Sequence, residues 1–178
     1  MSPAELKALV RTVPDFPAPG IHFRDITTLI GDGPGLAATV AWLAEQARAG
    51  GAQAIAGMEA RGFIFGAAVA VALGVGFVPI RKSGKLPVAT IGVDYHLEYG
   101  TDRLEMDPAT VHAGQRVALV DDLIATGGTA RAAAALLRKA GADVDRAVFV
   151  IGLPDLGGAT ALAEMGVATT ALMEFPGH

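Results

Sequence analysis

The sequence predicts an α/β fold with a mainly parallel, twisted sheet flanked by helices. Short apolar runs alternate with Ala- and Leu-rich runs of helical spacing along most of the 178 residues. Hydrophobic residues make up 52% of the chain, enough to cover both faces of a buried sheet. No Pro-, Gly- or Ser-rich linker divides the chain, so we expect one domain over residues 1–178.

The expected elements follow one another in a regular order. The clearest strand is Arg116–Val120, which we expect to end at Asp121 and Asp122. Further buried strands are predicted at 54–57, 76–80, 147–151 and 168–174. Helices are predicted near residues 3–12, 34–49, 62–73, 129–140 and 158–165. Residues 93–98 and 103–106, separated by Gly100 and Thr101, predict a hairpin.

The composition excludes several classes of function. The chain has 14 Lys and Arg against 18 Asp and Glu, a formal charge of −4, so we expect no nucleic-acid partner. There is no cysteine, which excludes disulfides, thiolate metal sites and cysteine nucleophiles. Residues 62–80 carry no charge, but glycines and Pro79 interrupt them, so a helix followed by a buried strand is expected there. We expect a cytoplasmic protein with no membrane segment and no signal peptide.

The turn after strand 116–120 has the chemistry of a phosphate site. Ligands of parallel sheets bind beyond the carboxyl ends of the strands, where this turn lies. The free N–H groups at the start of the following helix and its dipole attract anions, and glycine lets the backbone approach them. The residues expected to contact a phosphate are Ala125, Thr126, Gly127, Gly128 and Thr129.

The two carboxylates before this turn add a second function. Asp121 and Asp122 can accept hydrogen bonds from sugar hydroxyls or bind a hard divalent cation, directly or through water. Taken alone, a Gly-Gly pair can be only a turn, and an Asp pair can be a solvated strand end. Their order here indicates a phosphorylated ribose. The Walker A and dinucleotide-binding patterns do not occur in the chain.

Val120–Thr129 resembles the phosphoribosyl-pyrophosphate (PRPP) motif of type I phosphoribosyltransferases. Five other blocks, in the same order, resemble the adenine phosphoribosyltransferase branch of that family. These blocks are Phe16–Ile26, Glu59–Phe63, Arg81–Pro87, Leu97–Gly100 and Phe175–His178. The resemblance runs from about residue 14 to the end of the chain.

This resemblance implies an activity and an architecture. The reaction would be adenine + PRPP = AMP + pyrophosphate, in purine salvage, with Mg²⁺ bound mainly through the substrate and its direct protein ligands unknown. The implied fold is the type I phosphoribosyltransferase fold, with a small N-terminal hood, a flexible lid hairpin within residues 82–99, and a homodimer as the active unit.

The resemblance also implies roles for individual residues. The 125–129 turn would bind the 5-phosphate, and Asp121 and Asp122 the ribose hydroxyls. Pyrophosphate would be bound by the cations Arg61, Arg81, Lys82 and Lys85. A cis peptide is expected between Glu59 and Ala60. Adenine would be bound by His22, Phe23 and Arg24.

Two of these assignments leave choices open. Arg24 could clamp the base or pair with Asp25. His22 departs from the family, in which this position is usually aliphatic. Glu98 is the candidate acid–base residue, because a base must accept the purine proton as the new bond forms. Tyr99, next to it, is assigned to the lid.

Other functions remain open on the sequence. A phosphoribosyltransferase for hypoxanthine, guanine or xanthine would share the PRPP motif. A PRPP-responsive regulator would keep the fold without turnover, but an acidic chain with no helix-turn-helix disfavours DNA binding. An unrelated domain would not explain the ordered blocks.

We predict that Glu98→Gln preserves PRPP affinity and lowers kcat by about 100-fold or more, the usual contribution of general acid–base catalysis. Steady-state kinetics with adenine as the acceptor, combined with PRPP binding, measures both quantities. Unchanged turnover would remove Glu98 from the mechanism.

Overall fold

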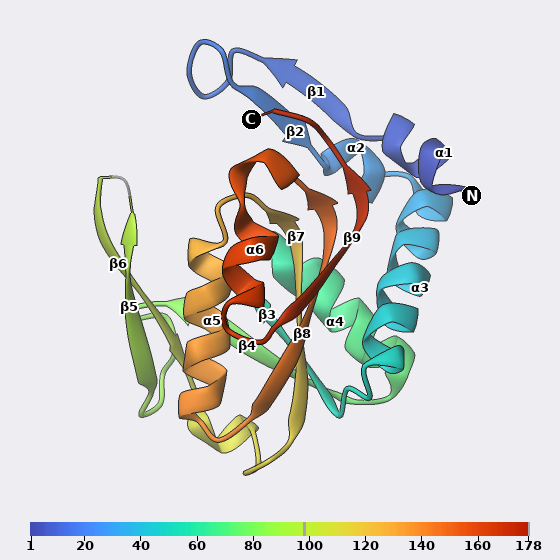
Figure 1. The fold of residues 1–178 in the computed structure, drawn as a ribbon. Helices are drawn as coiled ribbons and strands as arrows, with labels where there is room; N and C mark the ends of the chain where they lie inside the picture. Colours follow the sequence, from blue (N-terminus) through green and yellow to red (C-terminus); the bar gives the residue numbers. More distant parts are fainter. Residues whose placement is uncertain (98, 178) are drawn as a thin grey trace.

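The computed structural model describes residues 1–97 and 99–177. Within them, a 7-stranded sheet has the order β5-β6-β4-β3-β7-β8-β9 (Figure 1). The strands are β3 (Ala54–Met58), β4 (Gly76–Lys82), β5 (Ile91–Leu97), β6 (Gly100–Met106), β7 (Arg116–Ile124), β8 (Asp143–Gly152) and β9 (Ala168–Glu174). The five strands from β4 to β9 in this order are parallel. β5 and β6 form an antiparallel hairpin, as predicted, but the expectation that Gly100 and Thr101 separate its strands was wrong. Both residues belong to β6, where they pair with Leu97 and His96. The expected α/β fold is confirmed.

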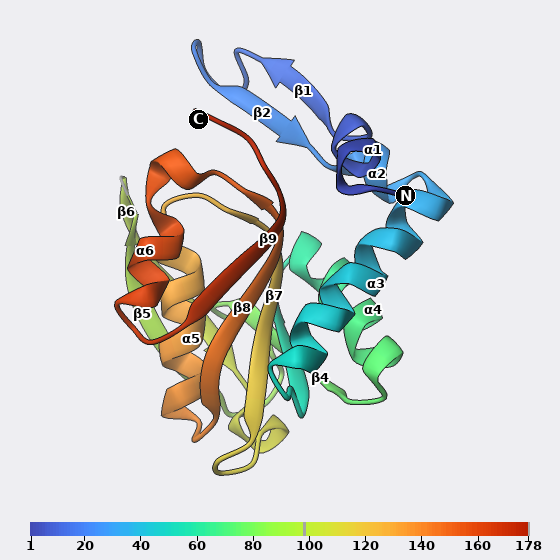
Figure 2. The ribbon, with the colours of Figure 1, turned by 45° about the vertical axis from the view of Figure 1, so that its right-hand side comes forward.

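Helices cover both faces of the sheet (Figures 1 and 2). One face packs on α3 (Gly33–Ala49) and α4 (Arg61–Leu73), the other on α5 (Gly128–Lys139) and α6 (Gly158–Ala163). Strand residues alternate between the two cores: Val148 faces the α3–α4 side and Phe149 the α5–α6 side, both 0% exposed. This alternation on buried strands explains why their sequences read as continuous apolar runs.

The N-terminal segment forms a separate small layer, which we call the hood. It consists of α1 (Pro3–Ala8), β1 (Arg11–Pro14), β2 (His22–Asp25) and α2 (Thr27–Ile30). The predicted helix over 3–12 was wrong beyond Ala8, because residues 11–14 pair with β2 as an antiparallel strand. The chain end after β9 runs up to the hood (Figure 1).

β7 extends past its predicted end. The sequence placed Asp121 and Asp122 at the end of a strand, but β7 continues to Ile124 by pairing with β8 through Leu123↔Ile151 and Ile124↔Gly152. Both carboxylates therefore project from within a strand, and their positions are fixed by the ladder.

The turn between β3 and α4 packs directly against β7. A Cβ on Gly62 would lie 2.7 Å from Asp121 Oδ1, and a Cβ on Gly57 would lie 2.7 Å from the Gly62 carbonyl oxygen. Only glycine fits at this distance. Glycine is therefore required at both positions for the first turn of α4 to reach the carboxylates of β7. The expected cis peptide between Glu59 and Ala60 is present in this turn.

Two short 3₁₀ helices, Pro108–Thr110 and Pro154–Leu156, complete the described elements. No helix within the described residues is long and apolar enough to cross a membrane. The uncharged residues 62–80 divide into most of α4 and the beginning of β4, as the sequence predicted.

Candidate active site

A cavity of about 490 Å³ lies at the carboxyl ends of β3 and β7. Four segments of the described residues form its wall: the turn after β3, the end of β4, the end of β7 with the following turn, and the half of the β5–β6 hairpin nearest its turn. The described lining residues are Met58, Glu59, Ala60, Arg61, Lys82, Tyr95, Leu97, Asp102, Leu104 and the ten residues from Asp121 to Ala130.

The topology explains this position. From β3 the chain first moves to β4 on one side, and it later returns to add β7 on the other side. The turns that follow β3 and β7 therefore diverge and leave a crevice between them. Ligands of open α/β sheets bind at such a switch point.

The turn from Ala125 to Thr129 leads into the N-terminus of α5. Gly127 has φ +86°, and a Cβ there would meet the backbone of Gly158 at 3.0 Å, so the turn requires glycine at this position. The Ala125 carbonyl accepts from the Gly158 N–H at 3.0 Å, which anchors the turn on α6. A Cβ on Gly128 would meet nothing within 4 Å, so the first turn of α5 is open to a ligand. Unpaired N–H groups and the helix dipole make this turn an anion site.

Asp121 and Asp122 line the same cavity. Asp122 is only 8% exposed and accepts a hydrogen bond from Arg61 Nε, which forms an ion pair between the first turn of α4 and β7. This hydrogen bond raises the pKa of Arg61. Asp121 Oδ1 accepts from the Asp122 N–H at 2.8 Å. Burial first, and the charge of Asp122 second, raise the pKa of Asp121 well above its ordinary value.

The four predicted pyrophosphate cations divide into two groups. Arg61 and Lys82 line the cavity, and Lys82 Nζ donates to Asp102 at 2.7 Å. Arg81 lies outside the lining; its Nε is 3.3 Å from Glu59 Oε1, and its guanidinium lies 5.8 Å from the Phe63 ring. Lys85 is exposed in the turn after β4, also outside the lining.

The three predicted adenine residues lie on β2 in the hood, outside the cavity lining. Phe23 packs edge-on against Phe16, with ring centroids 5.2 Å apart, and His22 is exposed. Arg24 stacks on Phe175 at 4.6 Å and donates to Thr12 Oγ1 at 2.7 Å.

The alternative that pairs Arg24 with Asp25 was wrong. Asp25 is instead the partner of Arg11, which faces it across the β1–β2 ladder. The hydrogen bond from the Thr27 N–H and that from Arg11 lower the pKa of Asp25 to about 2. Successive residues of a strand point to opposite faces, so Arg24 and Asp25 face apart.

Glu98, the candidate acid–base residue, lies outside the described residues. Its neighbour Tyr99 is 93% exposed at the end of the hairpin. The lid role of this hairpin stays a prediction.

Sequence analysis missed three polar residues of the cavity wall. Glu59 accepts from the Lys82 N–H at 2.8 Å and joins the ends of β3 and β4. Tyr95 and Asp102 face each other in the β5–β6 ladder, with 3.3 Å between the Tyr95 hydroxyl and Asp102 Oδ2. The signal for the last two was the hairpin register, which pairs residues 95 and 102 when residues 97 and 100 are paired.

Among the described residues, no group of three or more His, Cys, Asp or Glu is arranged to bind a metal ion. Two adjacent carboxylates can still bind the water shell of a cation that arrives with a phosphate.

Comparisons with known proteins agree with this geometry. Residues 27–160 match the family model described as a phosphoribosyl transferase domain. The structure superimposes on the crystal structure of adenine phosphoribosyltransferase from Thermoanaerobacter pseudethanolicus with a TM-score of 0.93, at 45% identity, covering 98% of this chain and 100% of that one. The fold and the site of this chain are therefore those of the phosphoribosyltransferase class: a parallel sheet with a turn suited to an anion and a carboxylate pair at its switch point.

The curated relatives narrow the class. The chain is 70% identical over 178 residues to adenine phosphoribosyltransferase from Erythrobacter litoralis and 67% identical to that from Novosphingobium aromaticivorans, in each case over 100% of both chains. The chain belongs to the adenine phosphoribosyltransferase family.

The raised pKa of Asp121 predicts a specific pH dependence of stability. The pKa of the Asp121 carboxyl group is higher in the folded protein than in the unfolded chain. The free energy of unfolding therefore falls as the pH rises from the unfolded pKa, near 3.8, through the folded pKa. Asp121→Asn removes this loss. We expect the variant to be more stable than the parent at pH 7, with a gain that shrinks toward pH 4, in urea unfolding at several pH values.

Asp94→Asn is the control for this measurement, because the Asp94 side chain is 64% exposed on β5. A stability difference between Asp121→Asn and the parent that does not change with pH would contradict a raised pKa of Asp121 in the folded protein.

Proposed function

We propose that the protein transfers the 5-phosphoribosyl group of PRPP to adenine, giving AMP and pyrophosphate in purine salvage. One observation carries this proposal: an anion-binding turn, a carboxylate pair and two cations line one cavity, in a chain of the adenine phosphoribosyltransferase family. PRPP presents a phosphate, a diol and a pyrophosphate, and each has a complementary group in this wall.

The substrate's two ends are assigned to different segments. The 5-phosphate binds at residues 125–129, where the backbone N–H groups of the first turn of α5 donate to it. Asp121 and Asp122 accept from the ribose hydroxyls.

The pyrophosphate group needs more positive charge than the cavity supplies. Four carboxyl side chains line the wall (Glu59, Asp102, Asp121 and Asp122), against the two cations Arg61 and Lys82. Each of these cations is already paired with a carboxylate. This balance supports a Mg²⁺ ion carried by the pyrophosphate. When bound, it neutralises part of the charge that develops on the leaving group.

The reaction exchanges one bond at C1′ of the ribose. The new bond forms between adenine N9 and C1′, while the C1′–O bond breaks and its electron pair leaves with pyrophosphate. The N9 proton must pass to a base, a role we assign to Glu98 from the sequence. Exclusion of water by the β5–β6 hairpin would protect the cation-like ribose from hydrolysis.

Specificity for adenine is supported by the relatives. Adenine phosphoribosyltransferase from Saccharomyces cerevisiae, 36% identical with a TM-score of 0.89, was crystallised with adenine and an imino-altritol bisphosphate. For the same selectivity in this protein, we expect the base to bind between the hood and the cavity, near the backbone of β2. Because the His22 side chain is exposed, we expect it to have no effect on base choice.

Turnover with four bases tests the proposal. We expect AMP from adenine with PRPP and Mg²⁺, and no nucleotide from hypoxanthine, guanine or xanthine, with products resolved by chromatography. IMP or GMP would overturn the base assignment and keep the PRPP site. PRPP binding without any turnover would support a regulator instead.

The homodimer and the cytoplasmic location expected from the sequence are part of this proposal. Support for the dimer comes from α4, which exposes a row of apolar residues: Val71 is 82% and Ile64 is 41% exposed. Exposed apolar helix faces of this kind mark protein interfaces. The location remains a prediction from the sequence.

We predict a solution mass of twice 18.1 kDa, and a monomer for Val71→Lys, by size exclusion with light scattering. Val88→Lys, at an exposed position outside α4, is the matched control and should remain dimeric. A monomeric parent protein would contradict the dimer.

A further inference from the structure

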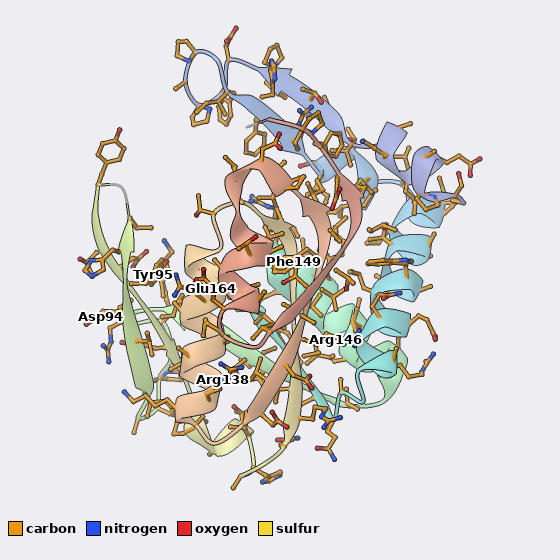
Figure 3. All side chains as sticks on the ribbon, in the orientation of Figure 1. Asp94, Tyr95, Arg138, Arg146, Phe149 and Glu164 are labelled. Carbon is orange, nitrogen blue, oxygen red and sulfur yellow. The ribbon has the colours of Figure 1, made fainter. Side chains whose placement is uncertain are left out.

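The half of the β5–β6 hairpin nearest its turn contributes a polar cluster to the cavity wall. Asp102 on β6 and Tyr95 on β5 line the cavity beside Lys82 of β4. Tyr95 lies on the side of β5 that packs toward α5, whereas Asp94 points away from it (Figure 3). These side chains occupy the wall between the 125–129 turn and the β4 cation.

Asp102 is fixed at the centre of this cluster. Its Oδ1 accepts from the Arg103 N–H at 2.8 Å, and its Oδ2 accepts from Lys82 Nζ at 2.7 Å and from the Tyr95 hydroxyl at 3.3 Å. Both carboxylate oxygens are therefore used, and one of their bonds is to the backbone. The carboxylate has little freedom to rotate.

The cluster lies in the same cavity wall as the phosphate-binding turn. Tyr95 gives its single hydroxyl proton to Asp102, and it lines the same cavity as Thr129. Hydrogen bonds thus run from Lys82 through Asp102 to Tyr95. They connect three different elements: β4, β6 and β5.

The lysine remains able to bind an anion. An ammonium group has three N–H donors, and the contact with Asp102 uses one of them. The hydrogen bond to Asp102 also raises the pKa of Lys82, so it stays charged. A free lysine side chain samples many rotamers, and a fixed carboxylate limits them.

We propose that Asp102 is a positioning residue for PRPP: with Tyr95, it holds the pyrophosphate cation Lys82 in place in the cavity that also contains the 5-phosphate turn. The inference rests on the proposed function. It assigns the β5–β6 hairpin a part in substrate binding in addition to its expected role as a lid.

Charge alone predicts the opposite result. Asp102 is a negative group beside a site for a polyanion, and its removal would strengthen PRPP binding if it were only a competing counter-ion for Lys82. Positioning predicts weaker binding, since Lys82 and Tyr95 both lose a fixed partner. The sign of the change therefore decides between the two roles.

The test is Asp102→Asn with PRPP and adenine kinetics. We expect the KM for PRPP to rise about tenfold, the size expected from the loss of a hydrogen bond to a charged group. The KM for adenine and kcat should stay within about threefold, because they depend on other parts of the wall. Tyr95→Phe should have a similar effect, and the double variant should be no worse than either single variant.

Asp94→Asn is the matched control. It removes an ion pair with Arg103, 3.1 Å long, from the same hairpin, but outside the cavity lining. This variant should leave the KM for PRPP unchanged. Equal effects of Asp94→Asn and Asp102→Asn would indicate a general loosening of the hairpin and overturn the proposal.

Calorimetric binding of PRPP separates this inference from the proposed function. The calorimeter measures PRPP affinity, and so the effect of Asp102 and Tyr95 on it, even if no base is turned over. If Asp102→Asn does not fold, Tyr95→Phe provides the test. Weaker binding by the variants supports the proposal. Binding as tight as in the parent, or tighter, overturns it.

Discussion

The architecture of the site depends on the close approach of the turn after β3 to the end of β7. Glycine at positions 57 and 62 allows this approach, because a Cβ at either position would overlap an oxygen atom at 2.7 Å. The approach brings Arg61 to Asp122 across the switch point of the sheet. With α4 and β7 joined, the crevice between β3 and β7 becomes a cavity lined by the phosphate turn and the carboxylates.

The cations of the site are held in place before substrate binds. Arg61 pairs with Asp122, Lys82 with Asp102 and Arg81 with Glu59, so each long side chain has a fixed carboxylate partner. This arrangement lowers the entropy lost when a polyanion binds, since the donors are already oriented. Among the described residues, the cavity wall also has more carboxyl groups than cations, which supports our proposal that a divalent cation arrives with the substrate.

Local patterns predicted most of the fold, and long-range contacts account for what they missed. The parallel strands and the 125–129 turn were predictable because apolar runs and turn residues report local structure. The hood was not, because residues 11–14 form a strand only by pairing with residues 22–25. The roles of Tyr95 and Asp102 were missed for the same reason, since cross-strand register brings them together.

A crystal structure with AMP bound tests the central claim most directly. We predict the 5′-phosphate against the backbone of residues 125–129 and the ribose hydroxyls within hydrogen-bond distance of Asp121 and Asp122. The adenine ring should lie toward the hood. A phosphate bound elsewhere in the cavity, or a ribose away from both carboxylates, would contradict the account of how this sheet edge recognises its substrate.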